Sequence, residues 1–430
     1  MADRPATRGK RLFRLAGMTA RVAGRYTSSR IKSVFQSEDD ARDSRAAVNR
    51  ESGELIAKTL GELKGAVMKV GQMASIAKDI LPRELAEALQ TLQREAPPMP
   101  YAVIAEQIEK EFGAAPETLF SEFNEEPFAS ASIGQVHRAR TDDGREVVVK
   151  VQYPGVDGAV DSDLTQLKWA LKASGMVRVN KRALDALFTE LRRSLIEELD
   201  YCNEADNVRL FEAHYADDPE VVIPKVVGER SSQRVLTLTF EPGDHMDETD
   251  GYPQDVRDAL GKTVFRLLAD QIFGWGVLHA DPNPANFAFR PDGRVVLYDF
   301  GCVKKLDTDT IDAYRDTINA SLIEDYAGVE DGLVRLGARD VSGPVVPPEY
   351  YKKWRDLLAQ PILGEAFDYG TAQLHHDALK LVPTFLAKYM RSFQPAPELV
   401  FVDRVIVGHY GTLRQLECRG NFRELLAPHL

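Results

Sequence analysis

The sequence is poor in cysteine and has no cysteine motif. Its three cysteines, Cys202, Cys302 and Cys418, are an odd number, lie far apart in a chain of 430 residues and form no C-x-x-C pair. This scarcity argues against a disulfide framework and against a zinc site, and it favours a reducing compartment. The eight histidines also lack a spacing typical of metal ligands. The adjacent His375 and His376 would point to different faces of a helix or strand, so we interpret them as surface polar residues.

Long hydrophobic runs are absent as well. The most apolar segments, 265–281 and 398–408, are interrupted by charged residues at Asp270, Asp403 and Arg404. Both fall short of the roughly 18 apolar residues that a membrane-spanning helix needs, so we expect no transmembrane segment. A hydrophobic content of 44% is instead typical of a globular protein with a core, and the length suits about two or three domains.

Outside the first residues, acidic residues outnumber basic ones. The formal net charge is −12, yet Met1 to Lys32 contains nine Lys or Arg and a single acid, so the rest of the chain carries −20. This acidic body argues against nucleic acid as the main partner. The basic head, with hydrophobic residues such as Leu12 and Phe13 between the charges, fits contact with an anionic membrane surface or a targeting role, and the alternative is a solvated tail.

The spacing of hydrophobic residues divides the chain into helical and strand-forming parts. From Glu51 to about Phe123, apolar residues recur every three or four positions, which predicts helices, one of them closed by Gly113. Alternating apolar residues then predict a small β-sheet, with helices at about 159–176 and 183–215. We therefore expect an α+β, bilobal fold made of a basic, flexible segment at 1–50, a helical extension at 51–125, an N-lobe with a β-sheet and a long helix at 126–243, and a mainly helical C-lobe at 244–430.

Two acids and one amide follow short apolar runs in the stretch VLHADPNPANFAFRPDGRVVLYDFG, residues 277–301. Asp281 and Asn286 stand five residues apart on a loop stiffened by two prolines, and Asp299 follows a predicted strand. A magnesium ion bound to a polyphosphate takes one or two hard oxygen ligands from the protein, while a further carboxylate can orient or deprotonate a nucleophile. The order D-x-x-x-x-N followed by D-F-G is typical of protein-kinase-like enzymes, although each piece alone is also an ordinary turn.

A lysine on a predicted strand adds to this pattern. The segment EVVVKVQ places Lys150 among apolar residues, where an unpaired charge would be costly. In a kinase-like fold such a lysine holds the α and β phosphates, and a glutamate on a helix fixes it. The helix predicted after it offers Glu197, Glu198, Asp200 and Glu204 as partners. Taken alone, Lys150 has a simpler alternative as a charge on an edge strand.

Glycine is scarce where protein kinases have a glycine-rich loop over the phosphates. The equivalent segment here, ASASIGQV at 129–136, keeps only Gly134. Methyl and hydroxyl groups replace hydrogen at positions where the backbone would approach phosphate closely. We therefore expect a nucleotide to bind differently than in an ordinary protein kinase.

The segments KVGQ, ASASIGQV, VVVKVQYPGV, EELDYCNEADN, HADPNPANF and YDFG together resemble the UbiB/AarF family of atypical kinases. The resemblance covers about residues 50–430. It implies a protein-kinase-like fold with an added helical domain that carries the K-x-G-Q motif, and an Ala-rich loop in place of the Gly-rich one. It also implies binding of ATP or ADP with Mg²⁺ and a link to ubiquinone and isoprenoid-lipid metabolism, with ATPase activity better supported in the family than transfer to protein.

The resemblance also implies roles for individual residues. Asp281 would be the catalytic carboxylate, Lys150 would contact phosphates with Glu204 as its partner, and Asn286 and Asp299 would hold the metal. The nucleotide-covering loop would comprise Ala129, Ser130, Ala131, Ser132, Ile133, Gly134 and Gln135. Four further residues would form contacts between the helical extension and the N-lobe, where a protein kinase receives its peptide: Lys69, Gln72, Glu198 and Asp200.

Three departures from the expected patterns stand out. Ser130 occupies a position where the family usually has alanine. Ala280 stands where protein kinases have arginine, so activation by a phosphorylated loop lacks its anchor. After YDFG the sequence enters a predicted helix at once, without a long activation segment. The last two features disfavour a conventional Ser/Thr protein kinase.

We therefore expect an ATP- and Mg²⁺-dependent atypical kinase or ATPase that acts on, or is gated by, a small lipid-like or quinone-like molecule. The alternative is a catalytically silent nucleotide-binding scaffold. The phosphoryl acceptor, which includes water, and the oligomeric state stay open. We expect a cytoplasmic protein in which any membrane contact is peripheral, because the C-terminal spanning segments of membrane-bound relatives are not found in this sequence.

Overall fold

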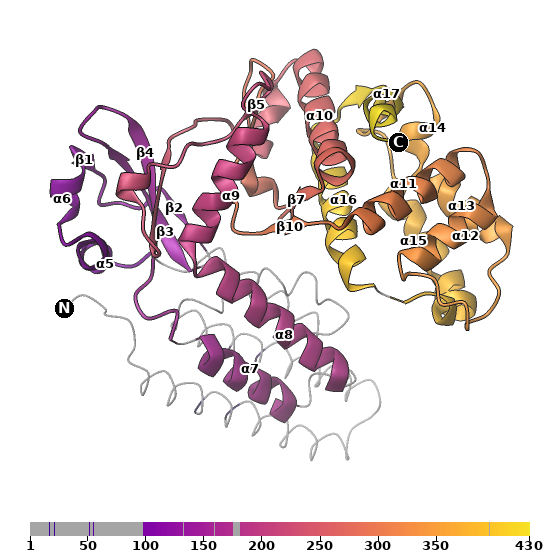
Figure 1. Ribbon diagram of the computed structural model, residues 1–430, viewed down its shortest axis with the longest axis horizontal. Helices are drawn as coiled ribbons and strands as arrows, with labels where there is room; N and C mark the ends of the chain where they lie inside the picture. Colours follow the sequence, from indigo (N-terminus) through magenta and orange to yellow (C-terminus); the bar gives the residue numbers. More distant parts are fainter. Residues whose placement is uncertain are drawn as a thin grey trace. The chain divides into compact units, whose positions relative to one another are not determined.

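The computed structural model describes residues 98–131, 133–158, 160–174, 181–394 and 396–430, together with single helical residues at positions 17, 21, 51 and 55. The chain divides into two compact units (Figure 1). Unit 1 contains the described residues up to Asp206 together with Lys225–Phe240, and unit 2 contains Asn207–Pro224 and Glu241–Leu430. The motif residues Lys69, Gln72 and Ser132 lie outside the described residues, as does most of the predicted helical extension.

Unit 1 is built around an antiparallel β-sheet. Its helices and strands are α5 (Tyr101–Phe112), α6 (Pro116–Leu119), β1 (Glu122–Phe123), β2 (Ala129–Ser130), β3 (Gly134–Arg140), β4 (Glu146–Gln152), α7 (Val160–Ser174), α8 (Lys181–Glu198), the 3₁₀ turn η1 (Gly228–Arg230) and β6 (Val235–Thr239). The strand order is β1-β3-β4-β6, with β2 pairing with β3. Helix α5 ends at Gly113, in the left-handed conformation, as the sequence predicts.

The alternation along β4 decides where its charged residue lies. Val147, Val149 and Val151 are fully buried on one face of the sheet. Lys150 therefore points to the opposite face, because successive strand side chains alternate. The strand is paired on both sides, with Val136 of β3 and Leu236 of β6 opposite Lys150. Lys150 is thus not an edge-strand residue.

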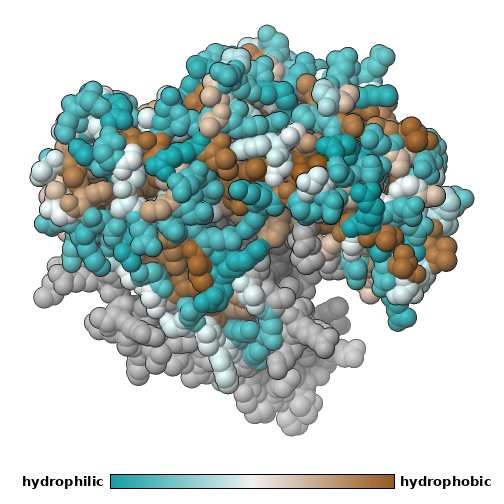
Figure 2. Space-filling model, in the orientation of Figure 1, coloured by the Kyte–Doolittle hydropathy of each residue, from teal (hydrophilic) through white to brown (hydrophobic). Residues whose placement is uncertain are grey.

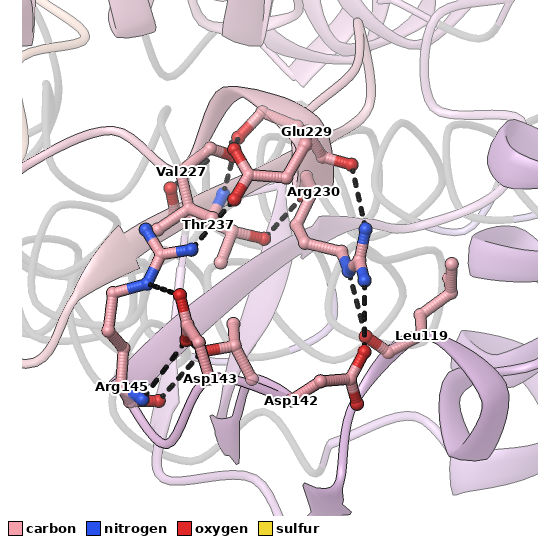
Figure 3. Close-up of polar contacts among 10 residues, drawn as sticks. Leu119, Asp142, Asp143, Arg145, Val227, Glu229, Arg230 and Thr237 are labelled. Atoms are coloured by element: carbon pink, nitrogen blue, oxygen red, sulfur yellow. Dashed lines mark hydrogen bonds and ion pairs between the residues drawn. The ribbon is translucent and has the colours of Figure 1, made fainter.

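Arginines tie the turn between β3 and β4 to neighbouring segments (Figure 3). Arg145 donates to Glu229 of η1 at 2.7 Å, and Arg230 donates to the carbonyl of Leu119, at the end of α6, also at 2.7 Å. Arg230 also forms a longer ion pair with Asp142, at 3.4 Å. Exposed pairs of this kind are each worth little, but together they connect the turn between β3 and β4, η1 and the end of α6.

The prediction of a single long helix at 183–215 is wrong. The structure has two helices there, α8 and α9 (Tyr201–His214), separated at Leu199 and Asp200. The backbone groups at the break have hydrogen-bond partners. The side chain of Gln152 donates to the carbonyl of Leu199 at 2.8 Å, and the carboxylate of Asp200 accepts from the backbone N–H of Cys202 at 3.0 Å, as an N-cap does. The apolar stripe continues through this region, which is why its spacing alone did not show the break. Helix α9 is divided between the units after Asp206.

Unit 2 is mainly helical, with short strands beside its motif loops (Figure 1). Its strands are β5 (Val221–Val222), β7 (Val277–His279), β8 (Phe287–Phe289), β9 (Val295–Leu297), β10 (Val303–Lys305), β11 (Phe367–Asp368) and β12 (Arg419–Gly420). They form three small sheets, β5-β9-β8, β10-β7 and β11-β12. Its α-helices are α10 (Gln254–Ala269), α11 (Thr308–Leu322), α12 (Tyr326–Arg335), α13 (Pro348–Leu358), α14 (Gln360–Leu363), α15 (Leu374–Thr384), α16 (Pro397–Gln415) and α17 (Phe422–Leu426).

Tighter and wider helical turns complete unit 2: the 3₁₀ segments η2 (Met246–Gly251), η4 (Pro284–Asn286), η6 (Met390–Ser392) and η7 (Ala427–His429), and the π-helical segments η3 (Asp270–Trp275) and η5 (Phe385–Tyr389). Helix α11 begins at Thr308, soon after the D-F-G motif, and Asp307 caps it, so the prediction that no long segment follows this motif is confirmed. Across the described part of the chain, no helix is both long and apolar enough to cross a membrane.

The core of unit 2 contains a buried histidine. His409 on α16 is 3% exposed, and its Nδ1 lies 2.9 Å from the carbonyl of Val405. Its ring stands edge-on to Phe287. Burial lowers the pKa of His409 to about 4, because a charged imidazolium would lose its hydration there. His409 is therefore neutral in the folded protein at neutral pH.

This burial predicts a pH-dependent stability. The pKa of His409 is about 4 when folded and about 6.5 when unfolded, so the unfolded state binds the extra proton between these values. The stability that a neutral His409 contributes is fully present above pH 6.5 and is lost as pH falls towards 4, at up to about 1.4 kcal/mol per pH unit. Urea unfolding followed by tryptophan fluorescence at several pH values should show a shallower pH dependence for His409→Leu. A matched change at the exposed His376, H376L, should leave the slope as in wild type, and equal slopes for H409L and wild type would contradict the interpretation.

Candidate active site

A lysine and a glutamate form a close pair in unit 1. The Nζ of Lys150 lies 2.9 Å from both carboxylate oxygens of Glu204, which sits in the first turn of α9. The side chain of Lys150 is 15% exposed and that of Glu204 is 4% exposed. The ammonium also lies 5.2 Å from the centre of the Tyr201 ring, within reach of a cation–π interaction. Because α9 starts only after the break at Asp200, that break sets which face of the helix meets β4.

Gly134, the one glycine in the Ala-rich loop, has a structural reason to be there. A Cβ at this position would lie 2.2 Å from the carbonyl oxygen of Val151, well inside the contact distance that real Cβ atoms tolerate. Gly134 pairs with Gln152 at the first register position of β3 and β4. The glycine is therefore required by close approach of two strands, whatever it does for a nucleotide.

The other described residues of the loop range from exposed to buried, with Ala131 in between. Ala129 and Ser130 are exposed, whereas Ile133 is 1% exposed. Gln135 is fully buried, and its amide is hydrogen-bonded to both backbone groups of Met99 and to the ring of His137. The side chains of Ile133 and Gln135 therefore belong to the packing of unit 1, and only their backbones could face a nucleotide.

Of the four residues expected to join the helical extension to the N-lobe, two are described. Glu198 is the last residue of α8, and Asp200 lies in the break before α9, where its carboxylate caps the new helix. The spacing E-x-D thus places one carboxylate on a helix end and the other in a turn. Lys69 and Gln72, their expected partners, lie outside the described residues.

In unit 2 the catalytic-loop candidates follow β7. Asp281 comes two residues after the strand, and Asn286 ends the 3₁₀ turn that Asn283 caps through Ala285. The Asn286 amide nitrogen donates to the backbone carbonyl of Asp281 at 3.2 Å. This bond orients the amide and leaves its oxygen, the atom that binds cations, as the group turned towards other ligands. Asn286 is 7% exposed, so surrounding groups restrict the movement of its side chain.

Asp299 has a left-handed backbone, with φ of 53°. This conformation is uncommon for a residue with a Cβ, although aspartate tolerates it better than most. Its carboxylate accepts from the N–H of Gly301 at 3.2 Å. The Nε2 of buried His279 lies 2.9 Å from the Asp299 carbonyl and 3.1 Å from that of Tyr298, close enough for one shared hydrogen bond. His279 thus connects the strand before Asp281 with the turn that carries Asp299.

The residues on either side of Asp299 are held as well. Phe300 is fully buried, and its carbonyl accepts from the side chain of Asn207 at 2.9 Å. Burial raises the pKa of Tyr298 to about 12, so its phenol stays protonated and donates to the carbonyl of Glu241 at 2.5 Å. These anchors keep the Asp299 backbone from relaxing out of its strained conformation.

Arg404 is a residue of this site that sequence reasoning missed. It lies on α16 and donates to the carbonyl of Ala280, the residue immediately before Asp281. Its guanidinium also lies 5.7 Å from the Phe401 ring centre. Ala280 is fully buried and donates its own N–H to Cys302 at 2.8 Å. The only sequence signal for Arg404 was a charge that interrupts an apolar segment.

The structure thus brings Lys150 to Glu204 within unit 1, and it brings the loops of Asp281, Asn286 and Asp299 together within unit 2. An antiparallel sheet with a central lysine–glutamate pair, and two acid-bearing loops joined by a buried histidine, define a protein-kinase-like fold. Their roles in binding and catalysis stay predictions. Besides Arg404, sequence reasoning missed His279 and Asn207, although both stand inside the segments that carried the resemblance.

Comparisons with known proteins identify the family. A model of the ABC1 atypical kinase-like domain matches residues 91–332. Atypical kinase COQ8, mitochondrial, of Saccharomyces cerevisiae is 32% identical over 337 residues, covering 77% of this chain and 66% of that protein. Atypical kinase coq-8, mitochondrial, of Caenorhabditis elegans is 29% identical over 436 residues, covering 98% of this chain and 57% of that protein. Among solved structures, Rv3197 of Mycobacterium tuberculosis, in complex with erythromycin, matches with a TM-score of 0.63 and 28% identity, covering 92% of this chain and 98% of that one.

The chain belongs to the ABC1 atypical kinase-like family. The predicted resemblance to UbiB-type atypical kinases and the predicted kinase-like α+β fold are therefore confirmed. The chain spans 66% and 57% of the length of the two curated relatives named above, so it corresponds to a part of each of them.

The lysine–glutamate pair makes a prediction about stability. Lys150→Met removes the ammonium from a carboxylate that is only 4% exposed, which should lower the unfolding free energy by about 3 kcal/mol. Adding Glu204→Gln to this variant removes the buried charge and should restore a good part of that loss. Urea unfolding of wild type, K150M and K150M/E204Q measures both effects. If the double variant were no more stable than K150M, the unpaired charge of Glu204 would not be the cause of the lost stability.

Proposed function

We propose that this protein is an ATP- and Mg²⁺-dependent atypical kinase or ATPase. The observation that carries the proposal is the Lys150–Glu204 pair: an ammonium on the middle of a paired strand, held at 2.9 Å by both oxygens of a nearly buried carboxylate. A structural lysine does not require so restricted a position. An ammonium that binds phosphates requires a restricted position, because its geometry must be set before the nucleotide binds.

The donor set of unit 2 fits magnesium. Mg²⁺ prefers oxygen ligands and is bound by one or two protein side chains together with phosphates and water. Asn286 and Asp299 supply an amide oxygen and a carboxylate, and the hydrogen bonds to Asp281 and Gly301 fix how these groups are presented. When bound, the ion would neutralise phosphate charge. Asp281 would then accept the proton of the attacking hydroxyl or water, and Lys150 would hold the α and β phosphates.

The acceptor is proposed to be water or a small lipid-like or quinone-like molecule rather than a protein. Helix α11 begins only seven residues after Gly301, so the chain has no long segment there on which a peptide could dock. The relatives carry the names of atypical kinases of mitochondria. By family likeness we place the activity in, or in control of, quinone and isoprenoid-lipid metabolism, with an anionic membrane surface as a further partner of the basic N-terminal segment.

ADP release tests the proposal. Purified protein with ATP and Mg²⁺, with and without phospholipid vesicles, should release ADP, and Asp299→Asn should reduce the rate by about a hundredfold or more, because the metal loses its charged ligand. Asp331→Asn on α12, an exposed aspartate, is the matched control and should behave as wild type. Nucleotide binding detected by a thermal shift, without turnover in any condition, would support the silent-scaffold alternative and contradict the proposal.

Arg404 is proposed as a positioning residue for the catalytic loop. Arg404→Leu removes the donor to the Ala280 carbonyl, and a small displacement of Asp281 should lower kcat by roughly 10- to 100-fold. KM for ATP should change little, since no phosphate contact is lost, and Arg404→Lys should recover part of kcat. Arg414→Leu, an exposed arginine of the same helix, serves as control. A loss in R404L that appears only in KM would contradict a positioning role.

A further inference from the structure

One helical run of unit 2 carries hydrophobic residues on two different faces. It comprises α15, η5 and η6, Leu374–Ser392. Pro383 interrupts its hydrogen bonding, since proline has no N–H, and the turn that follows widens into the π-helical η5. The inner face packs Phe385 and Tyr389 onto the core cluster around Tyr350, with the Tyr350 and Tyr389 ring centres 4.2 Å apart. The run is thus firmly attached to unit 2.

The outer face of this run carries a second apolar stripe that faces solvent. Leu379 is 64% exposed, and Leu386 and Met390 are each 54% exposed. Pro383, also exposed, lies between them, so the spacings are four, three and four residues, which is the repeat of one helix face. A helix that has already placed aromatic residues in the core gains nothing within the fold from a second hydrophobic face. The stripe therefore suggests an apolar environment outside the described chain.

The neighbouring loop extends the same surface. Val341 is 71% exposed and Val345 is 86% exposed. The loop is fixed beside the end of the run, because Ser392 donates to the Pro344 carbonyl at 2.7 Å and accepts from the N–H of Asp340 at 2.9 Å. Figure 2 shows hydrophobic side chains gathered towards the right-hand end of the visible face, the part that carries α12, α13 and α15 in Figure 1. We call Leu379, Leu386, Met390, Val341 and Val345 the apolar surface.

Positive charge accompanies the apolar surface. Lys388 and Arg391 are exposed, and neither forms an ion pair with another residue that the structure describes. Lys380 is exposed as well and pairs with Asp377, the only acidic residue of the run. The run therefore carries a formal +2 in a chain whose net charge is −12. Local positive charge on an acidic protein needs a reason other than solubility.

We infer that the apolar surface docks on an anionic phospholipid bilayer, with Leu379, Leu386 and Met390 inserted at the level of the acyl chains and Lys388 and Arg391 at the headgroups. Exposed apolar residues on one face of a helix flanked by lysine and arginine are the composition of interfacial helices. A second copy of the chain fits less well, because a twofold interface would set the cations of the run against those of the same run. The inference does not depend on the proposed ATP chemistry.

Vesicle sedimentation tests the inference without nucleotide. The full chain should bind vesicles of phosphatidylcholine with about one third phosphatidylglycerol more tightly than vesicles of phosphatidylcholine alone. Leu386→Asp with Met390→Asp should weaken binding at least about tenfold, because two charges would enter the acyl region. Lys388→Gln with Arg391→Gln should weaken binding roughly tenfold on the anionic vesicles only. Trp169→Asp, an equally exposed apolar position in unit 1, is the control and should bind like wild type.

A local probe separates this surface from the basic N-terminal segment, which could bind the same vesicles. In Met390→Trp the new indole should shift its emission to the blue on adding anionic vesicles and should be quenched by lipids brominated on their acyl chains, relative to wild type. Absence of quenching in a protein that sediments with the vesicles would overturn the inference. So would lipid-free sedimentation velocity that shows a dimer in wild type and a monomer in the Leu386→Asp/Met390→Asp variant, since the surface would then be a self-interface.

Discussion

The hydrogen bonds around His279 hold the acidic part of the candidate site in place. Its ring lies fully inside unit 2 and contacts the carbonyls of both Tyr298 and Asp299, while its own strand leads directly to Asp281. A left-handed aspartate would otherwise relax, because the conformation costs on the order of 1 kcal/mol or more for a residue with a Cβ. Holding it requires partners on both sides, and Asn207 and Glu241 supply the others. The backbone that carries Asp299 is thus held by buried contacts on both sides, and the same histidine lies on the strand that leads to Asp281.

The same logic explains why Lys150 lies where it does. A lysine in the middle of a sheet is stable only if its ammonium finds a carboxylate, and the carboxylate must come from a helix that starts at the right residue. Asp200 determines that start by capping α9, and Gln152, two residues after Lys150, supplies the donor for the carbonyl that the break releases. The strand, the break and the helix therefore depend on one another. Asp200, which matches an acid of the family motif, also has a structural role as the cap of α9. Gly134 is similar, because strand pairing demands it independently of any ligand.

Sequence reasoning recovered what depends on local pattern. The strands around 129–152 follow from period-two alternation and turn residues, the end of α5 follows from Gly113, and the lysine, glutamate and acidic loops follow from motifs whose chemistry is known. Sequence reasoning failed where the structure is decided by an interaction with a residue far away in the sequence. Nothing near Leu199 shows that Gln152 will satisfy its carbonyl, so the helix was predicted to continue. Arg404 lies 124 residues from Ala280 in sequence, and from its own neighbourhood it is merely a charge within an apolar stretch. Packing between segments far apart in the chain, and not propensity, determines both.

Ala280 and Arg404 together show how this site differs from that of a switched protein kinase. An arginine beside the catalytic aspartate can receive a phosphate and couple the catalytic loop to modification of an activation segment. Here the corresponding side chain is the fully buried methyl group of Ala280, which cannot bind a phosphate. The segment after the D-F-G motif leads within a few residues into α11. The loop is instead held through its backbone by an arginine from α16, a helix that closes the core with Val402 and Val405. A support built into the hydrophobic core is present whenever unit 2 is folded. In the proposed activity, control would therefore act on what reaches the site and not on whether the loop of Asp281 is formed.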